Sequence, residues 1–400
     1  MDVGYRSRVQ TAGPTAFGDL GFGPYKTKEG FMEYGRSNGV LVAVTVAITL
    51  AASASVYAGP AGDDNEDKRR FTFALWADMP YSADESAKIP AFTADINDSK
   101  VAFSVFGGDI KSGSTLCTND VFTTAIDRFN AFEAPMIYVP GDNEWTDCHR
   151  TNNGGYNNLE RLDFLRATMF ATPQSFGQRQ LMLEHQGPLG GAYSENTRWT
   201  YGNVVFTGLN IPGSNNNKVN GADCSKKSVR TPADCAADNV EYAARDAANI
   251  TFMRSSFAMA RATGALGLVI IIQADPSFDL PETENANERT CIRAPQGYCL
   301  STTDVTLAGY DGYNAFIAAL TAETTSFNGQ VVLVHGDTHF FKVDKPLVDQ
   351  AHLIPNFTRV QTFGSPNVQW VRVTVDPKSR NLFTFEPMIV GAGGKKEDGD

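Results

Sequence analysis

Short apolar runs and longer stretches with helical periodicity alternate along the chain from residue 71 onwards. Five runs are rich in β-branched and aromatic residues and end at Gly, Asp or other polar residues, which is typical of buried strands. These runs cover residues 71–77, 101–106, 134–139, 266–272 and 331–334. Apolar positions at helical spacing occur between them, at residues 85–96, 121–132, 159–170, 240–263 and 313–327. This alternation predicts an α/β fold in which helices cover the faces of a central sheet.

The remaining stretches extend this prediction. Residues 193–209 have the pattern of two short strands, and residues 359–375 and 381–390 alternate as strands of a closing antiparallel layer. Residues 210–238 are rich in Asn, Gly, Ser and Lys, which predicts a long loop over the surface. We therefore expect one domain over residues 71–390, preceded by a charged linker at 59–70 and followed by a disordered tail at 391–400.

The N-terminal region contains an apolar stretch at residues 39–58 that carries no charged side chain. Its centre, residues 40–52, has the length of the apolar core of a signal peptide, and Val56 and Ala58 supply the small residues of a cleavage site. Residues 1–58 are therefore predicted to be a leader and signal peptide. The alternative is an uncleaved single-pass anchor, because about twenty residues can just span a bilayer. Either interpretation predicts an extracytoplasmic protein in the periplasm, at the cell surface or secreted.

Composition and charge narrow the class of protein. The chain has 400 residues, of which 42% are hydrophobic and 20% charged, as in ordinary globular proteins. Its formal net charge is −11 and it has no basic stripe, which argues against a nucleic-acid partner. A membrane contact is expected only if the N-terminal segment is not cleaved.

The chain has six cysteines, namely Cys117, Cys148, Cys224, Cys235, Cys291 and Cys299. An even number of cysteines in an exported protein indicates disulfide bonds. Cys224 with Cys235 and Cys291 with Cys299 are close pairs within loops, which leaves Cys117 with Cys148. This pairing is one of the fifteen that six cysteines allow. No C-x-x-C spacing is present, which argues against a structural zinc site or a thioredoxin-like site.

Each of the five predicted buried strands ends in a polar cluster. The clusters are Asp78, Asp109, Asp142 with Asn143, Gln273 with Asp275, and His335 with Asp337 and His339. Carboxylates gathered at one edge of a sheet repel one another, and a cation among them makes the arrangement tolerable. The sequence therefore predicts a metal site at this edge.

The order of these clusters resembles that of the metallophosphoesterase superfamily, the calcineurin-like phosphoesterases. In that family the strands end in D-x-H, G-D, G-N-H-E/D, a lone H and G-H-x-H, and the second aspartate bridges two metals. The corresponding positions here are 78–80, 108–109, 141–144, 273 and 336–339. The resemblance covers approximately residues 71–341 and implies a four-layer αββα sandwich with mixed sheets.

Carried over position by position, the resemblance implies two metal sites. One would use Asp78, Asp109 and His339, and the other Asp109, Asp142, Gln273 and Asp337. The chain departs from the family at several of its histidines and at one asparagine: the substituted positions are Pro80, Asp142, Asn143, Gln273 and Asp337. The chain therefore resembles a divergent member.

The implied ligands are nearly all oxygen atoms. Such a set favours Mn²⁺, Mg²⁺ or Ca²⁺ over Zn²⁺ as the two divalent ions. Iron stays open as an ion for the site. A purple iron centre is not expected, because residues 110–113 lack the tyrosine that purple acid phosphatases carry shortly after the second motif.

The resemblance implies a metal-dependent phosphoesterase that hydrolyses a small phosphate ester by metal-bound hydroxide. Asn143 stands where the family has its catalytic histidine, so it can contact the phosphate but cannot give a proton. His335 is then the preferred candidate for protonating the leaving group. The alternative is a metallophosphoesterase-like ectodomain that has lost catalysis and binds a ligand or a metal, which the residues Pro80, Asn143 and Gln273 favour.

Overall fold

The computed structural model describes residues 70–276, 292–293, 299–300, 311–349 and 352–391, all within the compact unit Gly59–Asp400. The expected signal peptide lies outside the described residues, as do almost all of the linker and tail. The limits drawn at residues 58, 70 and 390 therefore stay predictions. Among the helices in the described ranges, none combines the length and the apolar composition needed to cross a membrane.

The first sheet has five strands. Their order is β16 (Phe383–Met388), β15 (Trp370–Val375), β1 (Phe71–Trp76), β2 (Ser104–Phe106) and β3 (Met136–Tyr138). The three N-terminal strands are parallel; β15 pairs antiparallel with β1, and β16 pairs antiparallel with β15 at the edge of the sheet.

The second sheet has seven strands. Their order is β11 (Lys342–Asp344), β14 (Phe357–Gln361), β10 (Gln330–His335), β7 (Gly267–Ile271), β6 (Val204–Gly208), β5 (Thr197–Tyr201) and β4 (Glu184–His185). Its centre is parallel and its two edges are antiparallel. Two short hairpins, β8 (Ile292–Arg293) with β9 (Cys299–Leu300) and β12 (Val348–Asp349) with β13 (His352–Leu353), lie outside both sheets.

The prediction of one closing antiparallel layer at the C-terminal end was wrong for β14. This strand runs parallel to β10 in the second sheet, whereas β15 and β16 are antiparallel strands of the first sheet. Alternation of apolar and polar residues indicates which face of a strand is buried, but it does not specify the neighbouring strand or its direction.

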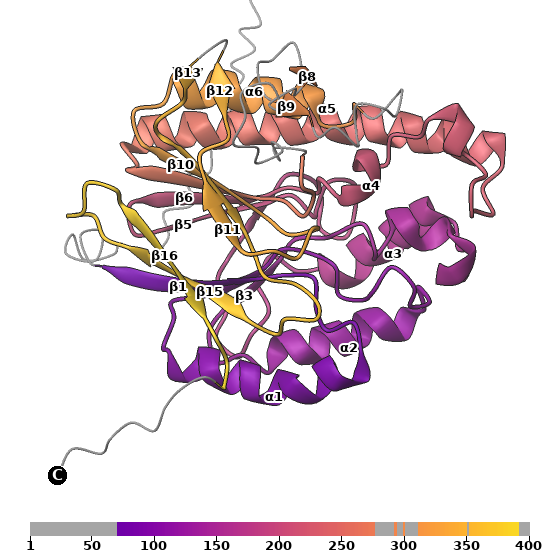
Figure 1. Ribbon diagram of the computed structural model, residues 1–400, viewed down its shortest axis with the longest axis horizontal. Helices are drawn as coiled ribbons and strands as arrows, with labels where there is room; N and C mark the ends of the chain where they lie inside the picture. Colours follow the sequence, from indigo (N-terminus) through magenta and orange to yellow (C-terminus); the bar gives the residue numbers. More distant parts are fainter. Residues whose placement is uncertain (1–69, 277–291, 294–298, 301–310, 350–351, 392–400) are drawn as a thin grey trace, which may run out of the picture. The chain divides into compact units, whose positions relative to one another are not determined.

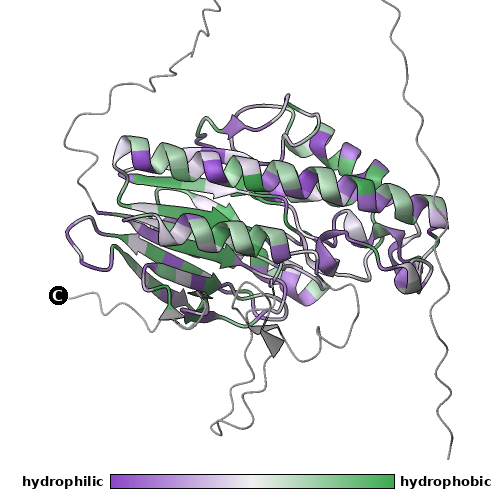
Figure 2. Cartoon of the chain, turned by 90° about the horizontal axis from the view of Figure 1, so that it is seen from above, coloured by the Kyte–Doolittle hydropathy of each residue, from purple (hydrophilic) through white to green (hydrophobic). Residues whose placement is uncertain are grey.

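Helices cover the outer face of each sheet (Figure 1). The first sheet is covered by α1 (Ala83–Asp98), α2 (Asn119–Asn130) and α3 (Asn158–Met169), and the second by α5 (Pro232–Thr263) and α6 (Asn314–Thr325). In the view from above, long helices lie across strands that are strongly apolar (Figure 2). The predicted four-layer αββα sandwich with mixed sheets is confirmed.

The layers follow from the two-residue period of the strands. Phe206 and Ile271 point into the apolar core between the two sheets, whereas Val205 and Ile270 pack against α5 and α6. Both faces of the central strands are therefore buried, and only the strand ends remain for polar side chains.

Helix α5 begins at Pro232, earlier than the expected start at residue 240. Thr231 and Asp234 form a capping box, in which Asp234 N donates to Thr231 Oγ1 at 3.2 Å and Thr231 N donates to Asp234 Oδ2 at 2.7 Å. Proline at the first helical position fits the same helix start. The signal was present in the sequence, but the polar composition of the region concealed it.

Two of the three predicted disulfides are confirmed. Cys117 is bonded to Cys148 and Cys224 is bonded to Cys235. The third predicted pair, Cys291 with Cys299, lies outside the part of the chain whose side chains are described. Disulfides persist in oxidising compartments, so the two bonds are compatible with an extracytoplasmic protein.

Candidate functional site

The six predicted metal ligands converge where the strands of both sheets end. Asp78 and Asp337 come from different sheets, yet Asp337 N lies 3.2 Å from both carboxylate oxygens of Asp78. His339 Nε2 lies 3.8 Å from Asp78 Oδ1, and Gln273 Nε2 lies 3.4 Å from Asp337 Oδ1. The sandwich thus brings together residues that are more than 250 positions apart in the chain.

The aspartates at this edge are buried and repel one another. Burial raises the pKa of Asp78 well above its ordinary value, and the Asp337 carboxylate raises it further. Burial likewise raises the pKa of Asp109, with Asp142 as the next largest cause. For Asp337, burial and then Asp142 raise the pKa in the same way. Negative charge at this edge is therefore costly unless a cation compensates it.

Four of the predicted ligands have a left-handed backbone conformation. The φ angles are 56° for Asp78, 67° for Asp109, 75° for Asp337 and 67° for His339. Residues other than glycine adopt this conformation at a free-energy cost, and such residues concentrate at functional sites. The strain indicates that the positions of these side chains are specified by something other than stability.

Glycines allow the backbone to approach these carboxylates closely. A Cβ atom on Gly213 would lie 2.6 Å from Asp142 Oδ2 and 3.0 Å from Asp337 Oδ1. A Cβ atom on Gly336 would clash with Asp78 Oδ2. Any side chain at either position would fill the space beside the carboxylate oxygens.

Asp109 is the most heavily hydrogen-bonded of the aspartates. Its Oδ1 accepts a bond from the backbone N–H of Asn143 at 3.1 Å, and its Oδ2 accepts one from Asn143 Nδ2 at 2.6 Å. The hydroxyl of Tyr81 also donates to Asp109 Oδ2, at 2.9 Å. Burial and then Asp109 raise the pKa of Tyr81.

Glu144 supports the loop that carries Asp142 and Asn143. Its Oε1 accepts bonds from Asp109 N at 2.8 Å, Tyr138 Oη at 3.0 Å and Gly141 N at 3.3 Å. The side chain is completely buried, and its Oε2 has no hydrogen-bond partner among the described residues. The burial of a carboxylate in support of a neighbouring loop is typical of residues that orient metal ligands.

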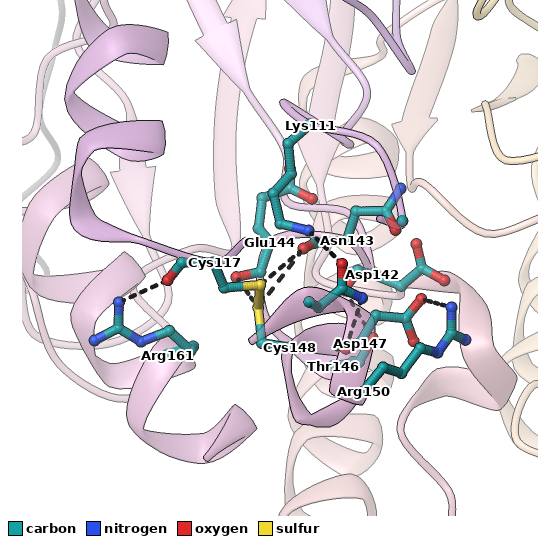
Figure 3. The surroundings of a disulfide bond; sticks show 12 residues. Lys111, Cys117, Asp142, Asn143, Glu144, Thr146, Asp147, Cys148, Arg150 and Arg161 are labelled. Carbon is teal, nitrogen blue, oxygen red and sulfur yellow. Dashed lines mark hydrogen bonds and ion pairs between the residues drawn. A yellow bond between two sulfur atoms is a disulfide. The ribbon is translucent and has the colours of Figure 1, made fainter. Parts of the chain in front are cut away.

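The Cys117–Cys148 disulfide lies directly behind this loop (Figure 3). Cys148 Sγ lies 3.1 Å from the carbonyl oxygen of Glu144, and both sulfurs are buried. The disulfide therefore connects the segment after β2 with the short helical turn after β3, and it restrains the backbone that presents Asp142 and Asn143.

A left-handed turn at Ser214–Asn217 covers the other side of Asp142. All four residues have φ between 52° and 60°, which is rare for consecutive residues other than glycine. Ser214 Oγ lies 2.8 Å from Asp142 Oδ2 and 2.7 Å from Asp147 Oδ1. The expectation that residues 210–238 form a loop over the surface was therefore wrong for this turn, because Asn215 and Asn216 are buried.

The turn is held in place by Arg245 of α5. The Arg245 guanidinium is completely buried and donates to Asn210 O at 2.8 Å, Asn216 O at 2.9 Å and Asn216 Oδ1 at 2.6 Å. It also lies over the ring of Trp145, 5.1 Å from the centroid. Arg245 thus supplies donors to both buried oxygens of Asn216, and it shares Asn210 O with Asn249 Nδ2, which donates to the same oxygen at 2.8 Å.

A cavity of about 440 Å³ opens beside Asp142 and Asp337. One wall is formed by Ser214, Asn215 and Asn217 of the left-handed turn and by residues 218–220 after it. Another wall is formed by Asp147, His149 and Arg150. Arg150 Nη1 lies 2.5 Å from Asp147 Oδ2. The cavity gives a small molecule access to the carboxylates.

The structure also locates the remaining predicted site residues. Gln273 Oε1 accepts a bond from Gly213 N at 2.6 Å, so Gln273 links the left-handed turn to Asp337. His335 is completely buried at the end of β10, with Nδ1 3.0 Å from Gly336 O. The roles assigned to these residues stay predictions.

Within the described ranges, no three His, Cys, Asp or Glu side chains are already arranged as a metal-binding group. The donor set nevertheless suits hard cations, because it combines buried carboxylates with one amide and one imidazole, and burial raises the pKa values of Asp78, Asp109 and Asp337. The space that Gly213 leaves beside Asp142 and Asp337 points in the same direction. The residues therefore fit divalent ions.

Sequence reasoning missed three residues of this site. Tyr81 could have been noticed as the residue after Pro80, which occupies a ligand position of the resembled family. Ser214 and Arg245 gave no signal in the sequence, since their importance arises only from contacts across the fold.

No protein-family model and no curated protein matches the chain. Similar solved structures include GAP50, the anchor in the inner membrane complex of Plasmodium, with 14% sequence identity, a TM-score of 0.38, and coverage of 82% of this chain and 90% of that one. A dimetal phosphatase from Danio rerio has 12% identity, a TM-score of 0.38, and coverage of 80% and 99%. A purple acid phosphatase from yellow lupin (Lupinus luteus) seeds has 11% identity, a TM-score of 0.45, and coverage of 82% and 52%. These similarities assign no activity to the chain.

Because Asp147 is buried, we expect the stability difference between Asp147→Asn and the wild type to depend on pH in the metal-free protein. Burial and then Asp142 raise the pKa of Asp147 from 3.8 to about 7. The folded state therefore keeps a proton that the unfolded state releases between pH 4 and pH 7, and this stabilisation is lost as pH rises. The unfolding free energy of Asp147→Asn, measured relative to that of the wild type, should therefore increase by up to about 4 kcal/mol between pH 4 and pH 8.

Urea unfolding in chelator at several pH values measures this difference. The pKa of His149 is lowered to about 3, so the contribution of His149 to stability rises with pH, opposite to that of Asp147. This contribution is present in both proteins and cancels when the variant is compared with the wild type. Asp163→Asn is the control, since that side chain is 82% exposed. A difference that stays constant with pH would contradict the prediction.

Proposed function

We propose that the chain is a divergent metallophosphoesterase that hydrolyses small phosphate esters with two divalent cations. The observation that carries the proposal is the convergence of four aspartates, three of them in left-handed conformations, at the strand ends of two sheets. A purely structural role would not require several negative charges to be buried together.

The two cation sites would share Asp109. The first would use Asp78, Asp109 and His339, and the second Asp109, Asp142, Gln273 and Asp337. Mn²⁺, Mg²⁺ or Ca²⁺ suit these donors better than Zn²⁺. When bound, the cations would neutralise the phosphate oxygens and lower the pKa of an attacking water.

The chain's own residues would bind and orient the ester. Asn143 Nδ2, now 2.6 Å from Asp109 Oδ2, is the donor that would turn to a phosphate oxygen. Arg150 lines the cavity beside Asp142 and would attract the anionic substrate. His335 is proposed as the proton donor to the leaving group.

The proposed location is extracytoplasmic, either secreted or tethered by the N-terminal segment. The buried Cys117–Cys148 disulfide behind the catalytic loop supports this location, because the site depends on a bond that requires an oxidising compartment. The acidic chain and its small cavity favour a small phosphate ester over nucleic acid.

A second candidate function is ligand or metal binding without catalysis. The contacts of Asn143 favour it, because both its backbone and its side chain donate to Asp109 and the family's catalytic histidine is absent. Ser214 and Arg150 also stabilise Asp142 and Asp147 within the protein itself.

One experiment separates the two functions. The full chain, produced in an oxidising host, is assayed for bound metal and for hydrolysis of p-nitrophenyl phosphate in Mn²⁺, Mg²⁺ or chelator. The enzyme proposal expects metal binding and hydrolysis, both lost in Asp337→Asn and kept in Asp163→Asn. Metal binding without hydrolysis would leave only the binding function, and no binding at all would exclude both metal-dependent functions.

A further inference from the structure

The cavity beside Asp142 and Asp337 continues outwards from the proposed metal sites to a group of basic side chains. Four of them line it, namely Arg150, Lys218, Lys226 and Arg230. When Asp142 and Asp337 are assigned to the metal ions, the lining keeps two further carboxylates, Asp147 and Asp223. The outer part of the cavity therefore suits an anionic group.

The two arginines of this group are held in position by the protein. Arg150 Nη1 lies 2.5 Å from Asp147 Oδ2, and its Nη2 donates to Ser214 Oγ at 3.1 Å. Arg230 Nη1 lies 3.0 Å from Asp238 Oδ2, which is buried. Each guanidinium has five N–H donors, so both keep donors for a ligand. Their orientation before binding reduces the entropy that a ligand would lose.

The two lysines are more exposed than the arginines. Lys218 Nζ lies 2.5 Å from Asp311 Oδ1, and Lys226 Nζ lies 3.6 Å from Asp223 Oδ1. The side chains of Lys218 and Lys226 are 32% and 70% exposed. Exposed ion pairs of this kind contribute little to stability, so a bound anion can attract both lysines at small cost.

The segment that carries Lys226 and Arg230 is joined to the opposite wall of the cavity. Val229 N donates to His149 O at 3.2 Å, in the loop that follows β3. The Cys224–Cys235 disulfide closes the same segment on itself. The basic side chains therefore belong to a built wall, even though the composition of residues 210–238 is that of a surface loop.

His149 provides a second indication of a ligand. Its side chain lines the cavity and is only 7% exposed, yet Nδ1 has no hydrogen-bond partner among the described residues. Buried polar atoms are normally hydrogen-bonded, because an unsatisfied one costs free energy. An imidazole nitrogen can donate as N–H, so an anionic group in the cavity can supply the partner that the protein does not.

We propose that the substrate carries a second anionic group, a carboxylate or a phosphate, and that the outer cavity binds this group through its four basic side chains. The inference rests on the proposed function, because the phosphate ester itself would lie at the metal sites. Asp142 and Asp337 line the same cavity as the basic side chains, so one small molecule can reach both places. Esters without the second charge would then be the poorer substrates.

Three phosphonates, which cannot be hydrolysed, measure this binding separately from catalysis. Propylphosphonate has one anionic group, phosphonopropionate adds a carboxylate, and propylenediphosphonate adds a second phosphonate. In calorimetric titrations of the full chain in Mn²⁺, at least one probe with two anionic groups should bind at least about tenfold more tightly than propylphosphonate. The tighter of the two identifies the second group as a carboxylate or a phosphate.

A double variant tests the assignment to the basic side chains. Lys218→Met with Lys226→Met should reduce the preference to within about threefold, because both side chains line the outer cavity. Lys88→Met with Lys227→Met is the matched control: it also removes two positive charges, but both lysines are exposed and neither lines the cavity. The control should keep the preference, and far-ultraviolet circular dichroism should match the wild type for both variants.

The outcomes separate this inference from the proposed function. Probes with two anionic groups that bind no more tightly than propylphosphonate, or a preference that the double variant keeps, would overturn the inference. A preference that the double variant loses, in a protein that hydrolyses no phosphate ester, would support the outer cavity as an anion site while refuting the enzyme. Hydrolysis of p-nitrophenyl phosphate without any preference among the probes would support the enzyme and refute the second anionic group.

Discussion

Asp109→Asn is expected to abolish phosphoester hydrolysis and, in the same protein, to raise the stability of the metal-free fold. Asp109 is the residue that both proposed cation sites share, so its loss removes a ligand from each. Activity should fall by at least about 1000-fold, which corresponds to about 4 kcal/mol of transition-state stabilisation. Bound metal should fall in parallel.

The gain in stability follows from the burial of Asp109. Because burial and then Asp142 raise its pKa, the ionised carboxylate costs free energy in the folded state. That cost is absent near pH 4, where the folded side chain is protonated, and it grows as pH rises above the ordinary aspartate pKa. Asparagine carries no charge and can still accept a hydrogen bond from Asn143 N.

Thermal melting in chelator and in Mn²⁺ tests both halves of the prediction. In chelator at pH 7 the variant should have a higher melting temperature than the wild type. Added metal should raise the melting temperature of the wild type but not that of the variant. Asp163→Asn, on the exposed face of α3, should behave like the wild type in both conditions. A variant that loses stability in chelator would indicate that Asp109 is a structural residue.

The strands and the polar residues at their ends could be predicted from sequence because both signals are local. The apolar run 71–77 contains β1 and the run 331–334 lies within β10; Asp78 follows the first run directly, and Asp337 comes three positions after the second. Their convergence could be expected as well, since the carboxyl ends of parallel strands share one edge of a sheet. The resemblance then ordered these ends into a single site.

The contacts that complete the site could not be predicted because they depend on tertiary placement. Ser214 is 72 positions from Asp142, and it lies in a segment whose composition is that of a surface loop. Its buried left-handed turn is stabilised by distant residues, among them Arg245, which donates to Asn216 O, and Tyr313, whose hydroxyl accepts from Asn216 N. Tyr81 is adjacent to a motif position, but its contact with Asp109 depends on how the two loops pack.

Arg245→Ala should destabilise the fold by about 3–5 kcal/mol and weaken metal binding at the second site, the one nearer the left-handed turn. The substitution removes every donor that Arg245 supplies, and it leaves both buried oxygens of Asn216 without that partner, whereas Asn210 O keeps its bond from Asn249 Nδ2. It also leaves the Glu241 carboxylate, 2.6 Å from Arg245 Nε, without that partner. The turn should then lose its left-handed conformation, and Ser214 should move away from Asp142.

Urea unfolding measures the first effect, and Mn²⁺ titration of the folded protein measures the second. Arg254→Ala is the matched control, because Arg254 lies on the same helix with a side chain 57% exposed, and its loss should change stability by less than about 0.5 kcal/mol. A variant that is destabilised yet binds metal as tightly as the wild type would separate the two roles. Arg245 would then hold the helix to the sheet, and the position of Asp142 would depend on the Cys117–Cys148 disulfide and on Glu144 instead.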